Sequence, residues 1–260
     1  MSELRKYPRT RHILGSRLQS GDEDVGSAAF AEIAGRHLVV EEKVDGANAA
    51  ISFASDGRVL LQSRGHYLTG GPRERHFDLL KRWANSVADA IRLVLKDRFI
   101  VYGEWLYAKH TIFYDALPHY FLEFDVFDRR RETFLSSAAR RRLLGGLPFR
   151  SVPVLHEGAI ADTTSLTRLL GRSAFKSPDW RAHLAGTARA LEQNLPLVAQ
   201  QTDDSDLMEG LYIKVEENDR VIDRFKFVRP DFLTAVLDSE SHWQSRPILP
   251  NLLAPGVTIA

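Results

Sequence analysis

The chain of 260 residues contains no cysteine. It therefore has no disulfide, no thiolate zinc site, no iron–sulfur cluster and no cysteine nucleophile. No apolar run approaches the ~20 residues of a membrane span, and the first eighteen residues carry charges where a signal peptide needs an apolar core. We expect a soluble intracellular protein, cytoplasmic by default and without a membrane partner, whose covalent chemistry would use another residue.

An excess of charge of either sign is also missing, because 35 Lys and Arg residues face 34 Asp and Glu residues. This balance argues against a strongly basic coat for nucleic acid, and a hydrophobic fraction of 44% argues against disorder. The N-terminal segment is locally basic, however. Its cations are Arg5, Lys6, Arg9, Arg11 and Arg17. Neutralising them should weaken nucleic-acid binding and flatten its salt dependence.

The first half of the chain reads as strands followed by a helix. Asp56-Gly57 predicts a two-residue hairpin turn between strands at 49–53 and 58–63. A single long helix is expected over 72–97. Its apolar face would consist of Leu80, Trp83, Val87, Ile91 and Val94, at spacings of three and four residues.

The second half begins with two buried strands at 98–107 and 119–128, rich in aromatic and β-branched residues. Residues 129–208 are expected to be mostly helical, with the longest helix starting near Ser177-Pro178-Asp179. Strands return at 209–217 and 220–228 across an Asn218-Asp219 turn, and one short helix is expected after Arg229. This order predicts one α+β domain with antiparallel or mixed sheets, and argues against a parallel doubly wound fold.

Lys43-Val44-Asp45-Gly46 stands where a strand runs into a glycine turn. A lysine amine there can act as a covalent nucleophile if neighbouring cations, a metal or burial lower its pKa from a reference near ~10.4. The simpler alternative is a surface lysine beside a turn.

Further polar residues follow in order, each within or next to an apolar run. They are Ser63-Arg64-Gly65, Gly103-Glu104, Phe124-Asp125, Glu209-Gly210-Leu211-Tyr212-Ile213-Lys214 and Arg224-Phe225-Lys226. A buried charge needs a partner, so each is either half of a structural ion pair or a ligand contact. The residues alone leave both readings open.

Taken together, these segments resemble the six ordered motifs of the covalent nucleotidyltransferase superfamily of DNA and RNA ligases and mRNA capping enzymes. The pattern runs from Lys43 to Lys226. Glu42 before the nucleophile, Asn48 after the glycine and Phe124 before Asp125 look most like the RNA ligase 2-type branch. The resemblance implies an ATP-grasp-like ligase adenylation domain with antiparallel sheets flanked by helices.

The resemblance also implies roles. Lys43 would attack ATP to form a lysyl–AMP bond, and AMP would then pass to a 5′-phosphate end of RNA, which a 3′-hydroxyl seals. Asp45 and Glu209 would hold Mg²⁺ through water, with Mn²⁺ as an alternative. Glu104 would contact the ribose and Phe124 would stack on adenine, while Glu42 and Asn48 fix the nucleotide. The cations expected to neutralise phosphate and to lower the pKa of Lys43 are Arg64, Lys214, Lys226 and, as a helper, Arg224.

One departure concerns the tail. Only residues 230–260 follow the last motif, too few for an OB-fold, so we interpret 1–260 as a single adenylyltransferase domain with a basic N-terminal segment, 1–36. RNA ends, in RNA repair, and a separate end-healing kinase or phosphatase are the expected partners. The alternatives are a DNA or polynucleotide ligase, a guanylyltransferase, or a non-catalytic nucleotide- or RNA-binding module.

Other features have simpler readings. The nine histidines show no metal-binding spacing. Arg129–Arg131 and Arg140–Arg142 are interpreted as solvated faces, with phosphate contact as the rival reading. The aromatics Trp83, Phe77, Tyr120 and Phe121 are expected in the core. For both Lys109 and His110, a substrate contact and an ordinary loop position are equally expected.

Overall fold

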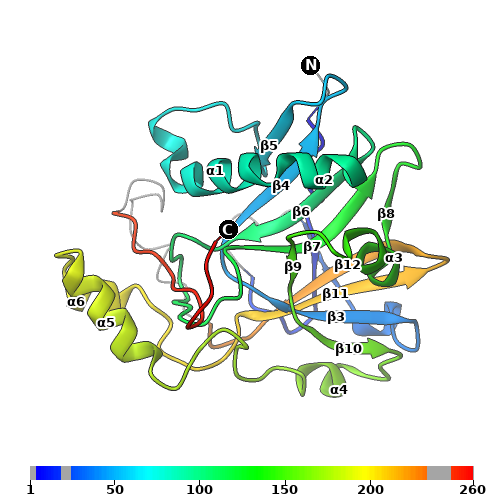
Figure 1. Cartoon of the computed structure of the whole chain (residues 1–260). Coiled ribbons are helices and arrows are strands. Elements are labelled where there is room, and N and C mark those ends of the chain that lie inside the picture. The colour runs from blue at the N-terminus through cyan, green and yellow to red at the C-terminus, as the bar shows by residue number, and fades with distance from the viewer. Residues whose placement is uncertain (1–3, 19–24, 233–246, 260) are drawn as a thin grey trace.

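The computed structural model describes residues 4–18, 25–232 and 247–259. Within them, twelve strands form one sheet that bends into two halves (Figure 1). The β6 half contains β4 (Ala47–Phe53), β5 (Val59–Ser63), β6 (Phe99–Trp105) and β7 (Phe121–Asp128). The β11 half contains β3 (Leu38–Lys43), β10 (Val154–Gly158), β11 (Gly210–Glu217) and β12 (Arg220–Val228).

Strand β8 (Thr133–Leu135) pairs with both β7 and β12 and so joins the halves. Three short strands lie at the margins: β1 (Arg11–Ile13), β2 (Ser27–Ala28) and β9 (Arg150–Ser151). Among the described strands, parallel pairing is limited to β1 with β12 and β2, and to β7 with β9. The predicted α+β class with antiparallel sheets is confirmed.

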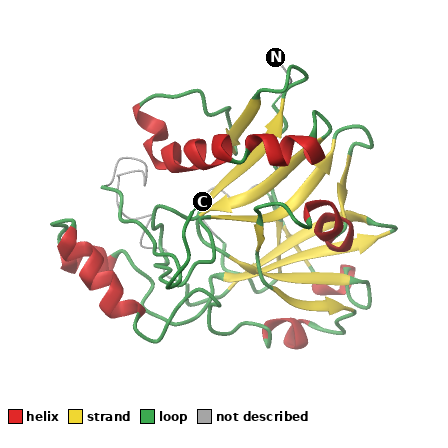
Figure 2. Ribbon diagram, in the orientation of Figure 1, coloured by secondary structure: helices red, strands yellow, loops and turns green. Residues whose placement is uncertain are grey.

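Helices α1 (Asp78–Ser86) and α2 (Ala88–Leu95) cover one side of the β6 half, after a 3₁₀ turn at Pro72–Phe77 (Figure 2). Leu80, Trp83 and Ile91 are buried, as predicted, but the expected single helix is wrong. Val87 leaves helical geometry at φ −102° and ψ 3° and separates the two pieces. After this break Leu95 is buried and Val94 only half-buried.

The two predicted hairpins form. Asn218 and Asp219 both adopt positive φ, at 51° and 61°, which suits a two-residue turn between twisted strands. The other turn is longer than predicted, because the Ala54 amide donates to the Arg58 carbonyl and Gly57 takes a φ of +85°. Such a glycine is typical of a three-residue hairpin with a bulge.

The prediction that 129–208 is mostly helical is wrong. Strands β8, β9 and β10 lie in this region. Its helices are short: α3 (Ser137–Leu144), α4 (Thr163–Thr167), α5 (Trp180–Ala190) and α6 (Leu195–Gln200). Strand β10 pairs with β3 as the last strand on its side of the sheet, and this partly exposed position does not require the apolar alternation that marks a buried strand. The longest helix, α5, does begin after Ser177-Pro178-Asp179, whereas the helix expected after Arg229 lies outside the described residues.

Each sheet half has its own apolar core on its outer face. On the β11 half, Leu211, Ile213 and Val215 alternate with inward-facing residues and pack with Leu38 and Val40. The β6 half packs against α1 and α2. Polar side chains are thereby directed to the space between the halves. Among the described residues, no helix is both long and apolar enough to cross a membrane.

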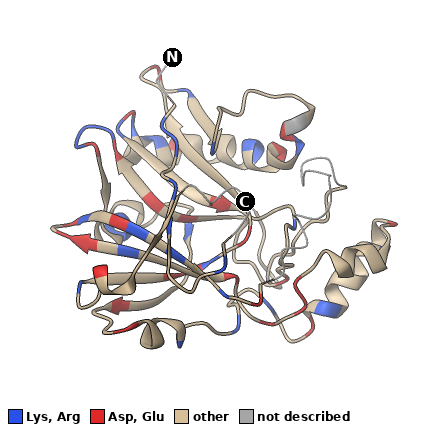
Figure 3. Ribbon diagram, turned by 180° about the vertical axis from the view of Figure 1, so that it is seen from behind, with Lys and Arg blue, Asp and Glu red and all other residues tan. Residues whose placement is uncertain are grey.

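The N-terminal strap, residues 4–13, bridges the two halves. The Arg5 carbonyl accepts hydrogen bonds from Gln62 in β5 and Tyr102 in β6, while β1 pairs with β12 on the other half. Several of the predicted basic residues have partners inside the molecule, since Arg5 lies 3.8 Å over the Phe127 ring and Arg11 pairs with Glu32 and Asp223. Charged residues of both signs are spread over the visible elements (Figure 3).

Candidate active site

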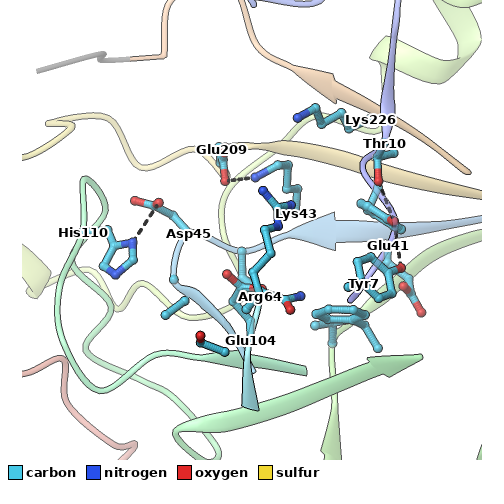
Figure 4. A pocket seen from close by; sticks show the side chains of 18 of the residues that line it. Tyr7, Thr10, Glu41, Lys43, Asp45, Arg64, Glu104, His110, Glu209 and Lys226 are labelled. Atoms are coloured by element: carbon cyan, nitrogen blue, oxygen red, sulfur yellow. Dashed lines mark hydrogen bonds and ion pairs between the residues drawn. The ribbon is translucent and has the colours of Figure 1, made fainter. Parts of the chain in front are cut away.

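A cavity of about 760 Å³ opens between the two sheet halves (Figure 4). Most of the predicted site residues line it: Glu42, Lys43, Asp45, Asn48, Arg64, Glu104, Phe124, Glu209 and Lys226. Tyr7, Thr10, Glu41, His110 and Tyr212 line it as well. Motifs that are far apart in the chain therefore meet at one site.

Lys43 is the last residue of β3, where side-chain alternation directs it and Glu41 to the inner face. Its Nζ donates to Glu209 Oε2 at 2.6 Å. The register accounts for this contact, because Lys43 pairs with Gly210 of the neighbouring strand β11. The predicted nucleophile and the predicted metal ligand are thus direct neighbours (Figure 4).

Two motif glycines are required by close packing. A Cβ on Gly46 would lie 2.8 Å from the Trp105 carbonyl oxygen, and one on Gly210 would lie 2.1 Å from the Phe227 carbonyl oxygen. Any larger residue would push β4 from β6, or β11 from β12. Both glycines keep the strands that carry the site residues in register.

The pKa of Lys43 is raised, although its burial alone would lower it. Burial is the largest single effect, but the Glu209 carboxylate, Glu104 and Asp45 all act in the opposite direction and together outweigh it. The expectation that cations lower the pKa of Lys43 is therefore wrong for the protein without ligand, because its nearest charged neighbours are carboxylates.

Glu104 on β6 faces the same cavity and lies opposite Asn48 of β4. Desolvation raises its pKa to about 8, and the opposing effects of Lys43 and Arg64 do not restore it. At neutral pH its carboxyl group is mainly protonated. A protonated carboxyl can both donate and accept hydrogen bonds, which suits contacts to hydroxyl groups.

Asp45 is fixed by the loop after β6. Its Oδ2 accepts from the Thr111 and Ile112 amides at 2.7 and 2.8 Å, and its own amide donates to the Tyr114 hydroxyl. His110 lines the cavity with Nδ1 3.9 Å from Asp45 Oδ1. Lys109 is not among the residues that line the cavity, and its Nζ donates to the Gln201 carbonyl. Of these two loop residues, only His110 therefore lines the cavity.

Phe124 reaches the cavity through a β-bulge. Tyr102 pairs with Asp125 and Gly103 pairs with Glu123, which leaves Phe124 as the extra residue of β7. Its half-buried ring is 5.1 Å from the Tyr7 ring and 6.3 Å from the Tyr212 ring. A bulge re-aims a side chain, and here it presents an aromatic face to the cavity.

The remaining predicted residues differ in their placement. Arg64 is exposed after β5, and Lys226 on β12 lines the cavity beside Thr10. Glu42 contributes to the wall, but its carboxylate accepts from Ser173 Oγ at 2.5 Å and from the Ala174 amide. That carboxylate is engaged by residues 173–174, on the opposite face of β3 from Lys43.

Lys214 and Arg224 do not line the cavity, so the expectation that they contact phosphate does not hold in this structure. Lys214 is fully buried, 2.8 Å from Glu41 Oε2 and 3.3 Å from Asp125 Oδ1, and it also donates to the Phe124 carbonyl. Arg224 Nε is 2.9 Å from Asp125 Oδ2. Tyr212 and Lys214 lie on the same inward face of β11, two positions apart. Tyr212 is the one that lines the cavity, so Lys214 lies beyond it in the interior.

These side chains belong to a buried ion cluster behind the cavity, made of Glu41, Glu123, Asp125, Arg140, Lys214 and Arg224. Arg140 is 1% exposed, so its interpretation as a solvated residue is wrong. Its exposed neighbours Arg141 and Arg142 agree with that interpretation. Glu41 could have been found from its place two residues before Lys43, whereas Tyr7 and Thr10 carry no motif.

The donor set fits a hard divalent cation. Asp45 and Glu209 bring carboxylate oxygens to one cavity, which is the chemistry that Mg²⁺ and Mn²⁺ prefer. No group of three or more His, Asp or Glu side chains in the described part of the chain could hold a metal ion by itself. Oxygens of a bound ligand or of water would therefore have to complete the coordination.

Comparisons with known proteins identify the family of this chain. The RNA ligase family model matches residues 36–228, which is most of the chain. The chain therefore belongs to the RNA ligase family. Comparison with curated proteins gives no significant match.

Solved structures share the fold at low identity. A variant of the Naegleria gruberi RNA ligase with AMP and manganese gives a TM-score of 0.52 at 15% identity, over 86% of this chain and 56% of that one. A second variant, with ATP and manganese, gives 0.51 at 15% identity, over 86% and 58%. An archaeal ATP-dependent RNA ligase gives 0.49 at 18%, over 86% and 48%. The chain thus spans about half the length of these ligases.

Proposed function

We propose that this protein is an ATP-dependent RNA ligase that seals 3′-hydroxyl and 5′-phosphate ends through a covalent AMP on Lys43. The observation that carries the proposal is the position of Lys43 Nζ. It lies in a cavity between the two sheet halves, 2.6 Å from Glu209 Oε2 and near Asp45 and Glu104. Family membership gives the reaction class.

In the first step, Lys43 Nζ attacks the α-phosphorus of ATP. A P–N bond forms, the bond to the bridging oxygen breaks, and pyrophosphate leaves. Nζ starts as an ammonium, so it must lose one proton to become the attacking amine and a second as the P–N bond forms. Glu209 Oε2 already accepts a hydrogen bond from Nζ, so it can pass these protons to water. Arg64 and Lys226 would neutralise phosphate charge, since they border the same cavity.

Asp45 and Glu209 would hold a divalent metal together with oxygens of the nucleotide and water. Such an ion neutralises phosphate charge and offsets the negative charge of the carboxylates near Lys43, which favours the free amine. Glu104 would contact the ribose hydroxyls and Phe124 the adenine. In the two later steps, AMP passes to the 5′-phosphate and the 3′-hydroxyl displaces it, while the same cations neutralise charge.

The test is incubation of the purified protein with α-labelled ATP or GTP and Mg²⁺ or Mn²⁺, followed by a denaturing gel and acid treatment. We expect an acid-labile AMP adduct with the wild type and none with Lys43→Ala or Lys43→Arg. Lys81→Ala is a matched control, since the side chain of Lys81 on α1 is 23% exposed against 20% for Lys43 but pairs with Glu74 in the preceding 3₁₀ turn.

Strand-sealing assays on nicked and broken RNA, with DNA in parallel, complete the test. A GMP adduct would indicate a guanylyltransferase, and sealing of DNA alone would indicate a DNA ligase. A folded protein that forms no adduct with either nucleotide would contradict the proposal and favour a non-catalytic binding module. Sealing only after a kinase or phosphatase treats the ends would support a separate end-healing partner.

A further inference from the structure

The wall of the cavity next to Phe124 holds a chain of three hydroxyl groups. The Tyr7 hydroxyl is 2.8 Å from the Tyr212 hydroxyl, which is 3.0 Å from Thr10 Oγ1. Tyr7 and Thr10 come from the N-terminal strap and Tyr212 from β11. All three residues line the cavity, and Tyr7 and Thr10 are 5% and 7% exposed.

The buried ion cluster fixes the direction of this chain. Tyr7 donates its single hydroxyl proton to Asp125 Oδ2 at 2.5 Å. Asp125 lies between Lys214 and Arg224, with N–O distances of 3.3 and 2.9 Å, so it is a carboxylate and can only accept. Tyr7 also accepts from Arg224 Nε at 3.0 Å.

The remaining protons then have one arrangement. Since the Tyr7 proton is committed to Asp125, Tyr212 must donate to Tyr7. Since the Tyr212 proton is committed to Tyr7, Thr10 must donate to Tyr212. Thr10 Oγ1, on a residue that lines the cavity, therefore has only lone pairs left and can only accept a hydrogen bond from a ligand.

We propose that Thr10, oriented through Tyr212 and Tyr7 by Asp125, selects adenine by accepting a hydrogen bond from its exocyclic 6-amino group. This inference rests on the proposed function, in which the base stacks on Phe124. The Tyr7 and Tyr212 rings lie 5.1 and 6.3 Å from the Phe124 ring, and Thr10, bonded to the Tyr212 hydroxyl, lines the same cavity. Guanine in the same orientation presents a carbonyl oxygen, and two acceptors repel each other.

The first measurement compares ATP with purine riboside triphosphate, which lacks only the 6-amino group, in the rate of adduct formation at Lys43. One neutral hydrogen bond is worth ~0.5–1.5 kcal/mol, so we expect the wild type to prefer ATP about 2–12-fold. Thr10→Val removes the acceptor and should bring that preference near 1. Thr10→Ser keeps the hydroxyl and should retain it.

The second measurement breaks the chain without removing Thr10. In Tyr212→Phe the Thr10 proton is released, so its hydroxyl can rotate and donate to guanine. We expect the ratio of ATP to GTP use to fall about 3–10-fold. Tyr102→Phe is the matched control, because Tyr102 packs on Tyr7 but donates to the Arg5 carbonyl outside the chain, and its ratio should stay at the wild-type value.

The outcomes separate the two proposals. A wild type that forms no adduct contradicts the proposed function itself. An active wild type whose ATP preference over purine riboside triphosphate persists in Thr10→Val contradicts the role of Thr10. Each variant is compared at equal folded fraction, measured by thermal unfolding. Every readout is the ratio of adduct formation with two nucleotides on the same protein, so a general loss of stability cannot produce the expected change.

Discussion

The cavity and the buried ion cluster lie side by side between the sheet halves, yet they treat charge in opposite ways. In the cluster, Asp125 is flanked by Lys214 and Arg224, and its pKa is lowered to about 2 because these cations outweigh desolvation. In the cavity, desolvation raises the pKa of Glu104 to about 8. Paired charges build the framework, whereas the cavity retains one carboxyl group, that of Glu104, whose pKa Lys43 and Arg64 do not restore, as expected where a charged ligand completes the site.

Removing one charge from the cluster should have the largest effect on stability. Arg140→Met leaves Glu41 and Glu123 without the guanidinium that lies 2.8 and 3.3 Å away, and we expect a loss of about 3–5 kcal/mol in the free energy of unfolding. Urea denaturation measures this. Arg141→Met removes an exposed arginine from the same helix and should cost less than ~1 kcal/mol. Equal losses of unfolding free energy in Arg140→Met and Arg141→Met would contradict the structural role assigned to the buried ion cluster.

Removing the ionisable carboxyl group of Glu104 from the cavity should instead raise the free energy of unfolding at alkaline pH. The carboxyl group of Glu104 binds its proton more tightly in the folded state, at a pKa of about 8 against 4.5 unfolded. The contribution of Glu104 to the free energy of unfolding therefore falls as pH rises from 4.5 through 8. Glu104→Gln keeps the neutral form, so it should be more stable than the wild type at pH 8.5, by ~1–3 kcal/mol, and nearly equal at pH 5.

Thermal unfolding at both pH values tests this, with the exposed Glu157→Gln as the control. A pH dependence that survives in Glu104→Gln would show that another group is responsible.

Phe124 belongs to both regions, since its ring faces the cavity and its carbonyl accepts from Lys214. Phe124→Leu keeps the backbone contact and removes the aromatic face. The loss of ~0.5–1.5 kcal/mol of stacking should raise the half-saturating ATP concentration about 2–12-fold. Phe149→Leu, in the apolar core of the β6 half, should lower stability without changing that concentration.

The smallest effect is expected from exposed charges on the N-terminal strap. Lys6 and Arg9 are exposed, and Arg11 pairs with Glu32 and Asp223. Replacing Lys6 and Arg9 by Gln should weaken RNA binding a few-fold and reduce its salt slope by up to ~2, measured by titration at several salt concentrations. Arg11→Gln should change the slope less. An unchanged slope in the double variant would exclude the strap from RNA binding.

Much of the site could be predicted because its residues stand next to motif glycines and at strand ends. Lys43 and Glu209 meet because β3 and β11 are neighbours in register, while Gly46 and Gly210 allow the close packing against β6 and β12 that holds these segments in place. Lys214 could not be placed, since a buried lysine at the right spacing serves an ion pair as well as a phosphate. Tyr7 and Thr10 carry no local signal, because their importance comes from pairing with strands more than 200 positions away.

That separation has a consequence for the order in which the site forms. Tyr7 and Tyr212 are 205 positions apart, and the strap that carries Tyr7 pairs with β12, the last long strand. During synthesis the strap emerges early and meets β5 and β6 once they follow, but its pairing with β12 and its contact with Tyr212 must wait for the last two long strands, so the nucleotide pocket is the part of the domain that closes last. A nascent or truncated chain that ends before β11 would lack the Glu209 carboxylate and one wall of the pocket. Labelling of Lys43 would then report completion of the whole fold, and slow closure of this long-range contact would limit how soon a new molecule becomes active.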